Sequence, residues 1–227
     1  MQIGGGEEGS SKVFIIEQEP NPRFAIRDGS KSSSLAASKN PSFTIESERG
    51  PVQLPGTDQQ VMFAHQGNNY DCGPCLVLNT YSVLGVPPPD TSVPGIRQRN
   101  NQLRAGERTQ PLGDSDWFST TDVGRMMRLG GLIDEPYSVK AKPQEAELRE
   151  SIRQKIAEVT QFFVYSTTGR HFKGIYSPDG VHYYLVDSLH SSITVVEQNA
   201  IYSLITEAQM SNRPEQVAIV YKQNERV

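Results

Sequence analysis

A cysteine that begins a predicted helix follows a glutamine by six residues. The segment from Gln66 to Cys72 is polar, and an apolar, helix-forming series follows it. The positive end of a helix dipole and the unpaired N–H groups there favour a thiolate over a thiol. Attack of that thiolate on a carbonyl creates an oxyanion, which the Gln66 carboxamide and the Cys72 N–H can bind. Gly73, next in the chain, removes a side chain that would crowd an incoming substrate.

A nucleophilic cysteine needs a base, and the chain contains four histidines. Residues 171–189 resemble two β-strands joined by the turn 178–180, whose sequence Pro-Asp-Gly favours a three-residue hairpin loop with a glycine at positive φ. In the register that this turn sets, His171 faces Asp187, and directly opposed Cβ atoms lie about 4.5–5.5 Å apart. The carboxylate would orient the imidazole and stabilise its cation. His182 lies an odd number of residues from Asp187, which predicts that it points to the opposite face.

The same cysteine belongs to a second motif, Cys72-Gly-Pro-Cys75, which has the spacing of a redox dithiol. A thiol-disulfide oxidoreductase would need this motif after a central strand of a βαβ unit, and residues 61–64 could form that strand. Cys75 lies one helical turn after Cys72. It is therefore either a resolving thiol or a residue that packs on one face of the helix.

In this chain order, Gln66, Cys72, His171 and Asp187 resemble the catalytic residues of the papain-like cysteine peptidases. Within that class, residues 70–74 and the late histidine strand are most similar to the double-glycine (bacteriocin) leader peptidase family and its stand-alone relatives. The chain departs from that pattern at Cys75, where a small apolar residue is more usual.

A local similarity to another family lies at residues 184–189, which resemble a segment of the ubiquitin-like-protein and adenovirus-type proteases. Those enzymes place histidine and aspartate before the glutamine and cysteine. The resemblances cover residues 60–90 and 160–190.

The resemblance implies a cysteine peptidase that hydrolyses a peptide or isopeptide bond after small residues such as Gly-Gly. Cys72 would be the nucleophile, His171 the base and acid, Asp187 its orienting group and Gln66 the oxyanion donor. The substrate would be a protein or peptide, including the processing of ubiquitin-like proteins, and neither cofactor nor metal is implied. The alternatives are the oxidoreductase, a deamidase or acyltransferase with the same triad, and a papain-like scaffold retained as a binding module.

The predicted elements give an α+β fold, in which a helical half carrying the cysteine helix packs on an antiparallel sheet carrying histidine and aspartate. Besides the hairpin, we predict helices over 72–83, 96–103, 120–129, 144–158 and 200–210, and strands over 160–165, 193–197 and 216–221. The first helix should end at Gly85, before three prolines, and Ser119 should cap the third.

Composition excludes several classes of function. The net charge is −4 and no dense block of lysine and arginine occurs, which argues against nucleic-acid binding. No apolar run approaches ~18 residues, and the start lacks the pattern of a Sec signal, so we expect no membrane span. A cytoplasmic location is expected, or delivery into a host or neighbouring cell by a route without a visible Sec signal.

Two regions are expected along the chain. Residues 1–50 read as a partly flexible N-terminal extension, with strands at 12–17 and 23–27 and a polar linker at 28–42. That extension is either a pro-segment or targeting arm, or a disordered or loosely docked addition. Residues 51–227 are expected to form the peptidase domain.

Overall fold

A computed structural model describes residues 48–139, 145–168, 171–210 and 215–223. The strands expected at 12–17 and 23–27, and the linker at 28–42, lie outside these described residues. The chain divides into two units, Met1–Pro41 and Ser42–Val227, and all the described residues belong to the second.

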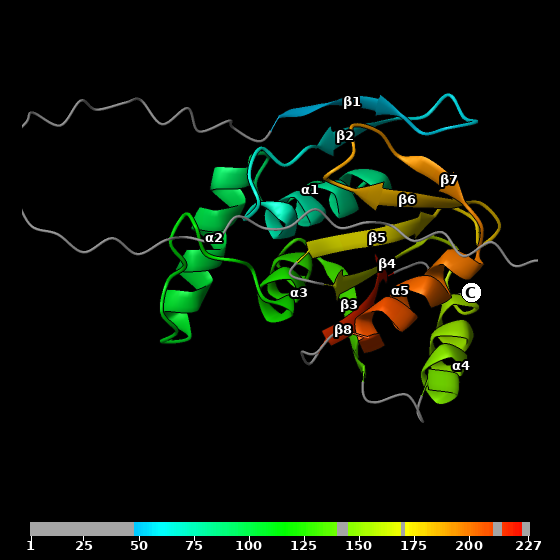
Figure 1. Ribbon diagram of the computed structural model, residues 1–227. Coiled ribbons are helices and arrows are strands. Elements are labelled where there is room, and N and C mark those ends of the chain that lie inside the picture. The colour runs from blue at the N-terminus through cyan, green and yellow to red at the C-terminus, as the bar shows by residue number, and fades with distance from the viewer. Residues whose placement is uncertain (1–47, 140–144, 169–170, 211–214, 224–227) are drawn as a thin grey trace, which may run out of the picture. The chain divides into compact units, whose positions relative to one another are not determined.

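The described residues form thirteen elements, shown in Figure 1. In chain order they are β1 (Arg49–Gln53), β2 (Gln60–Ala64), α1 (Cys72–Leu84), α2 (Val93–Gly106), α3 (Thr120–Leu129), β3 (Leu132–Val139), α4 (Glu145–Ile156), β4 (Phe162–Thr168), β5 (His171–Ser177), β6 (Tyr183–Asp187), β7 (Thr194–Val196), α5 (Asn199–Met210) and β8 (Glu215–Lys222).

Six strands form the main sheet in the order β3-β8-β4-β5-β6-β7, and every neighbouring pair is antiparallel. β1 and β2 form a separate antiparallel pair. The predicted α+β class is confirmed, with the cysteine helix in the helical half and the histidine and aspartate strands in the antiparallel sheet.

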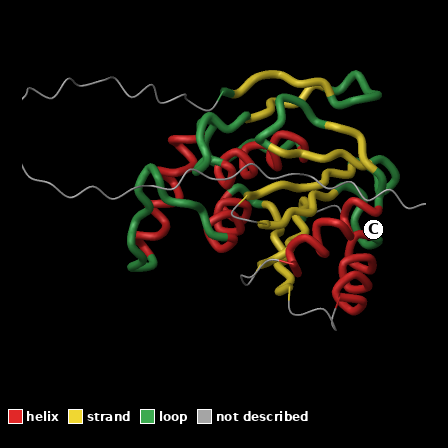
Figure 2. Tube along the Cα trace, in the orientation of Figure 1, coloured by secondary structure: helices red, strands yellow, loops and turns green. Residues whose placement is uncertain are grey.

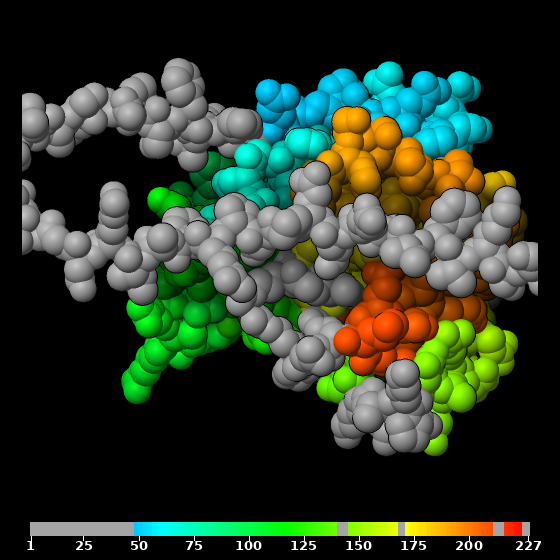
Figure 3. Space-filling model, in the orientation of Figure 1, coloured from blue at the N-terminus to red at the C-terminus, as the bar shows by residue number. Residues whose placement is uncertain are grey.

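Side chains alternate along the strands, so both faces of the main sheet are covered. On β4, Phe163 and Tyr165 join the core that contains the buried residues of α1 and α3. Phe162 and Val164, between them, join the core formed with α4 and α5. Figure 2 shows helices on both sides of the strands, and α4 and α5 are neighbours on the surface in Figure 3.

Helix α1 is the central helix of the core. Every residue in it except Ser82 is buried, which is why apolar residues occur on all sides of the helix. It ends where expected, because Gly85 adopts a left-handed conformation with φ of 66°. Buried Asn79 accepts from the Ala64 amide at 2.6 Å and donates to the Ala64 carbonyl at 3.0 Å. This pair of bonds fixes the end of β2, and therefore the start of the loop that carries Gln66, against α1.

The β5–β6 hairpin forms, but its predicted register is wrong by two residues. Asp187 lies opposite Lys173 rather than His171, and Tyr176 lies opposite Tyr184. The loop is longer than the three residues predicted, because the Asp179 carboxylate accepts from the amides of residues 181 and 182 and holds both outside the ladder. Gly180 does have the expected positive φ, 75°.

Candidate active site

Cys72 is the first residue of α1, and its side chain is buried. Asp71 occupies the N-cap position, but its carboxylate binds elsewhere. One oxygen accepts from Arg97 Nε at 3.0 Å and Nη2 at 2.9 Å, and the other accepts from Asn68 Nδ2 at 2.7 Å. Asp71 therefore does not cap the first N–H groups of the helix. These are the groups that would face an oxyanion formed at Cys72.

Gln66 lies in the loop between β2 and α1, and is held by the residue that follows Asp187. Its backbone N–H donates to the Ser188 carbonyl at 3.1 Å, and its side-chain oxygen accepts from the Ser188 hydroxyl at 2.8 Å. Because the oxygen end of the amide is engaged, the NH₂ end is left to act as the donor. Ser188 thus fixes both the position and the orientation of the predicted oxyanion donor.

His171 is the first residue of β5, and its imidazole reaches Asp187 diagonally across the hairpin. The distance from Nε2 to Asp187 Oδ1 is 2.7 Å. The two-residue register shift moves Asp187 along β6 but leaves it on the same face as His171, since side chains alternate with a period of two. The Leu189 amide donates to the same carboxylate oxygen at 3.0 Å. The structure therefore brings His171 and Asp187 together by a route other than direct opposition.

The imidazole of His171 is also hydrogen-bonded to the Cys72 side chain. Since Nε2 faces Asp187, this bond is left to Nδ1. Burial lowers the pKa of His171, but the hydrogen bonds with Asp187 and Cys72 outweigh burial and raise that pKa to about 9. For Asp187, burial raises the pKa, and the bonds from His171 and Leu189 outweigh it, so the pKa of this carboxyl is lowered. Both shifts favour an imidazolium–carboxylate pair at neutral pH.

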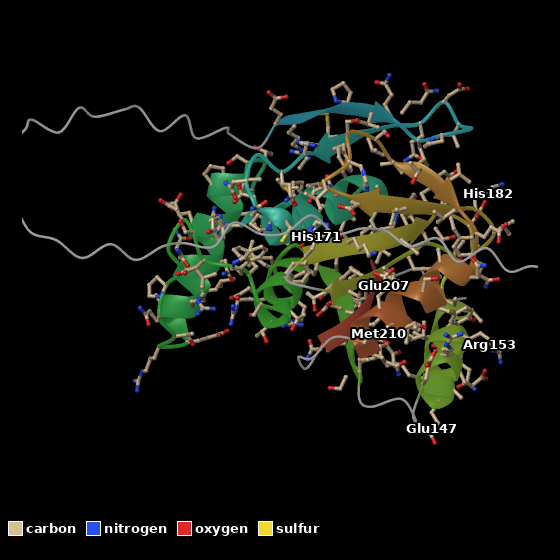
Figure 4. The ribbon with its side chains drawn as sticks, viewed as in Figure 1. Glu147, Arg153, His171, His182, Glu207 and Met210 are labelled. Atoms are coloured by element: carbon tan, nitrogen blue, oxygen red, sulfur yellow. The ribbon has the colours of Figure 1, made fainter. Side chains whose placement is uncertain are left out.

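His182 is not brought to this site. It lies in the hairpin loop, where Nδ1 contacts Asp179 Oδ2 at 2.6 Å and two thirds of the side chain is exposed. Figure 4 shows His182 and His171 at opposite ends of the hairpin. The pair of His182 and Asp179 therefore lies on an exposed loop, away from the cysteine helix. Near the cysteine helix, the other oxygen of Asp187 lies 3.8 Å from Nε2 of a further histidine, His190, whose side chain is largely exposed.

The surroundings of Cys75 bear on the dithiol alternative. Cys75 is fully buried in the core, one turn along α1. The strand that precedes the motif, β2, pairs antiparallel with β1, and all the strand pairs within the described ranges are antiparallel. The βαβ unit that a thioredoxin-type enzyme requires is therefore not what leads into Cys72.

Gly73 is needed for a reason that the sequence did not indicate. A Cβ atom at this position would lie 2.6 Å from the Cβ of Phe118, so the residue makes room for that ring rather than only for a substrate. Beside it, the rings of Tyr70 and Trp117 form an edge-to-face pair with centroids 5.3 Å apart. Aromatic side chains therefore line the segment on either side of Asp71 and Cys72.

Arg97 on α2 joins these segments, and sequence reasoning missed it. Besides Asp71, its guanidinium donates to the Tyr70 carbonyl at 2.7 Å and the Asp116 carbonyl at 3.0 Å, and it lies over the Phe118 ring. No local pattern marks this residue, because its partners are 19 to 27 positions away. Ser188 was missed for the same reason, since Gln66 is 122 positions away.

A cavity of about 930 Å³ lies between α1 and α2. Its walls include Asn68, Asp71 and Arg97, so it lies behind the loop that carries Gln66. Cys72 and His171 are not among the residues that line it. The cavity is therefore a separate feature from the cysteine–histidine pair, which joins the start of α1 to the start of β5.

Comparisons with known proteins give little further guidance. No family model matches the chain, including any for the leader peptidases, and no curated protein matches it. Among solved structures, the chain is similar to the ubiquitin-specific protease encoded by a tegument protein of murine cytomegalovirus, in complex with a ubiquitin-based suicide substrate. The two are 14% identical with a TM-score of 0.39, over 68% of this chain and 77% of that chain. A likeness this distant leaves the function to be argued from the site itself.

A membrane-spanning helix was not expected from the sequence. Among the helices of the described residues, each is too short or too polar to cross a bilayer.

Proposed function

We propose that the protein is a cysteine peptidase that hydrolyses a peptide or isopeptide bond through Cys72, His171 and Asp187. The observation that carries this proposal is the chain of contacts from the Cys72 side chain to the imidazole of His171 and on to Asp187, 2.7 Å away. A nucleophile, a base and an orienting carboxylate in hydrogen-bond contact are the elements that covalent acyl transfer requires.

The reaction begins with the Cys72 thiolate and the His171 imidazolium. The sulfur attacks the substrate carbonyl, and the oxyanion is bound by the Gln66 amide and the Cys72 N–H. His171 then protonates the leaving amine, and a thioester with Cys72 remains. The neutral imidazole takes a proton from water, and the water oxygen attacks the thioester. The acid is released, and the starting pair of thiolate and imidazolium is restored. Asp187 keeps the imidazole oriented throughout and stabilises its cation.

The proposed substrate is a protein or peptide with small residues, such as Gly-Gly, before the scissile bond. The support for this class comes from the sequence around the nucleophile. The resemblance of residues 70–74 to the leader peptidases implies a preference for small residues. Ubiquitin-like proteins end in such a pair, and their processing falls within this proposal.

Hydrolysis of a peptide that ends in Gly-Gly-aminomethylcoumarin tests the proposal. The wild-type protein should release the fluorophore and a free carboxylic acid, identified by mass spectrometry. Cys72→Ala and His171→Ala should each lose activity by about a thousand-fold or more. His182→Ala is the matched control, because it removes an imidazole paired with a carboxylate at an exposed site.

Three results would count against the proposal. Equal loss in His171→Ala and His182→Ala, with both variants folded, would contradict the assignment of the base. An acyl product joined to an added amine, in place of the free acid, would reassign the same triad to acyl transfer. No turnover in folded wild-type protein, across a panel of peptides, would leave the scaffold as a binding module.

A further inference from the structure

The proposed reaction makes no use of Cys75, although this thiol lies one helical turn from the nucleophile. Both cysteines are reduced in the structure. Both lie in one buried cluster with the apolar residues of α1. Cys75 is therefore close enough to Cys72 to matter when the Cys72 sulfur is oxidised.

The backbone places the two cysteines within reach of a disulfide. Residues three apart in an α-helix share a face, with Cβ atoms about 5–6 Å apart. A disulfide needs Cβ atoms about 3.5–4.5 Å apart, so an adjustment that brings the two Cβ atoms about 1–2 Å closer is enough. Cys72 can make it, because as the first residue of α1 its own N–H is outside the helical hydrogen-bond ladder. The Cys75 N–H, by contrast, donates to the Asp71 carbonyl at 2.9 Å and stays fixed.

The two sulfurs differ in reactivity. The Cys72 side chain is hydrogen-bonded to the imidazole of His171, a base that can accept its proton when the sulfur reacts with a peroxide. Cys75 lies one helical turn further along α1 and is completely buried among apolar side chains. A small oxidant such as hydrogen peroxide therefore reacts at Cys72 first.

We infer that Cys72 and Cys75 form a reversible oxidation site, in which Cys75 is the resolving thiol that protects the nucleophile from hydrogen peroxide. Hydrogen peroxide first converts the Cys72 thiol to a sulfenic acid and releases one water. The Cys75 sulfur then attacks the sulfenic sulfur, the S–O bond breaks, and the hydroxyl leaves with the thiol proton as a second water. The product is an intrahelical Cys72–Cys75 disulfide, which a dithiol reductant returns to two thiols.

This inference rests on the proposed function in so far as it needs a reactive Cys72. It also gives the dithiol spacing a role within a hydrolase, without requiring the oxidoreductase scaffold that the β1–β2 pairing excludes. In the disulfide form the nucleophile is blocked, so peptide hydrolysis should stop and return on reduction. Without Cys75, the sulfenic acid should instead be oxidised further to the sulfinic acid, which dithiothreitol does not reduce.

The test is peptide mapping by mass spectrometry under non-reducing, acid-quenched conditions, after treatment with hydrogen peroxide. Wild-type protein should yield a peptide with an internal Cys72–Cys75 disulfide, and its hydrolytic activity should fall to background and return fully with dithiothreitol. Cys75→Ala is the matched variant, since alanine suits a buried helical position. It should start with wild-type activity, accumulate sulfinic acid at Cys72, and fail to recover.

The mass measurement is independent of turnover, so the two proposals can fail separately. If Cys72 is oxidised to the sulfinic acid while Cys75 stays a thiol in wild-type protein, the resolving role is refuted even though the peptidase assignment stands. If the disulfide forms but reduced protein hydrolyses nothing, the oxidation site stands and the proposed function fails. Should Cys75→Ala not fold, the wild-type map alone still decides the question.

Discussion

Asp187→Asn keeps the shape of the carboxylate and removes its charge, so it isolates what that charge does to His171. The side-chain oxygen of asparagine can still accept the imidazole N–H that now faces Asp187 Oδ1 at 2.7 Å. The orientation of the His171 imidazole should therefore be largely retained. The imidazolium, however, loses its anionic partner, and we expect the variant to fail selectively at high pH.

The size of the effect follows from the pKa of His171, which is raised to about 9. With that pKa, about nine tenths of the imidazole is protonated at pH 8. Removal of an opposite charge at hydrogen-bond distance lowers a pKa by about 1–3 units, and a shift of about two units leaves roughly one tenth protonated at pH 8. At pH 6 both proteins are almost fully protonated. The ratio of variant to wild-type kcat/KM should therefore be about tenfold lower at pH 8 than at pH 6.

The assay is a pH profile of kcat/KM between pH 5 and 10 with the Gly-Gly-aminomethylcoumarin peptide, for wild type and Asp187→Asn. Asp179→Asn is the control, because Asp179 makes the same kind of contact to His182 on the exposed loop, and its profile should match wild type. If kcat/KM of Asp187→Asn is lower than that of wild type by the same factor at every pH, and falls at the same high pH, the claim that the Asp187 charge stabilises the imidazolium is refuted.

Three further predictions concern groups around the triad. Ser188→Ala removes one hydrogen bond that orients Gln66, so kcat/KM should fall by about 2- to 10-fold. Gln66→Ala should lower kcat/KM by about 100- to 1000-fold. A double variant that is no less active than Gln66→Ala would show that Ser188 acts through Gln66. Arg97→Met leaves the buried Asp71 carboxylate without its cation, and the free energy of unfolding in urea should fall by about 3–5 kcal/mol. Adding Asp71→Asn to this variant should restore part of that stability. A fall of less than about 1 kcal/mol would contradict the contacts described for Arg97. The pKa of His171 is raised in the folded protein, so the stability that its protonation contributes is complete below about pH 6.5 and is lost as pH rises through about 9. The free energy of unfolding should therefore decline over that pH range in wild type, and it should decline less in His171→Gln.

Local signals explain why some elements could be predicted from the sequence. The end of α1 follows from Gly85, and the start of α3 from Ser119, whose hydroxyl accepts from the Asp122 amide in a capping box. β3 could not be predicted in the same way. It contains Pro136 and lies at the edge of the sheet, where proline is tolerated. Its charged residues interrupt the alternation of apolar and polar side chains that marks a strand.

In the candidate site, the predicted strand register was wrong, but the predicted contact between His171 and Asp187 is present. The hairpin loop is two residues longer than its turn sequence predicts, because Asp179 binds backbone amides on its far side. An error of one residue would have put Asp187 on the opposite face, whereas an error of two preserves the face, and His171 reaches it diagonally. Ser188 and Arg97 had no such local signal, since each becomes important only through partners that folding brings close.

The most direct test of the central claim is covalent labelling with a peptide that ends in Gly-Gly and carries an electrophilic acyl group. Under reducing conditions, mass spectrometry should find one label per chain, on Cys72, with labelling unchanged in Cys75→Ala and strongly slowed in His171→Ala. Labelling of Cys75, or equal labelling of wild type and His171→Ala, would contradict the assignment of Cys72 as a nucleophile activated by His171.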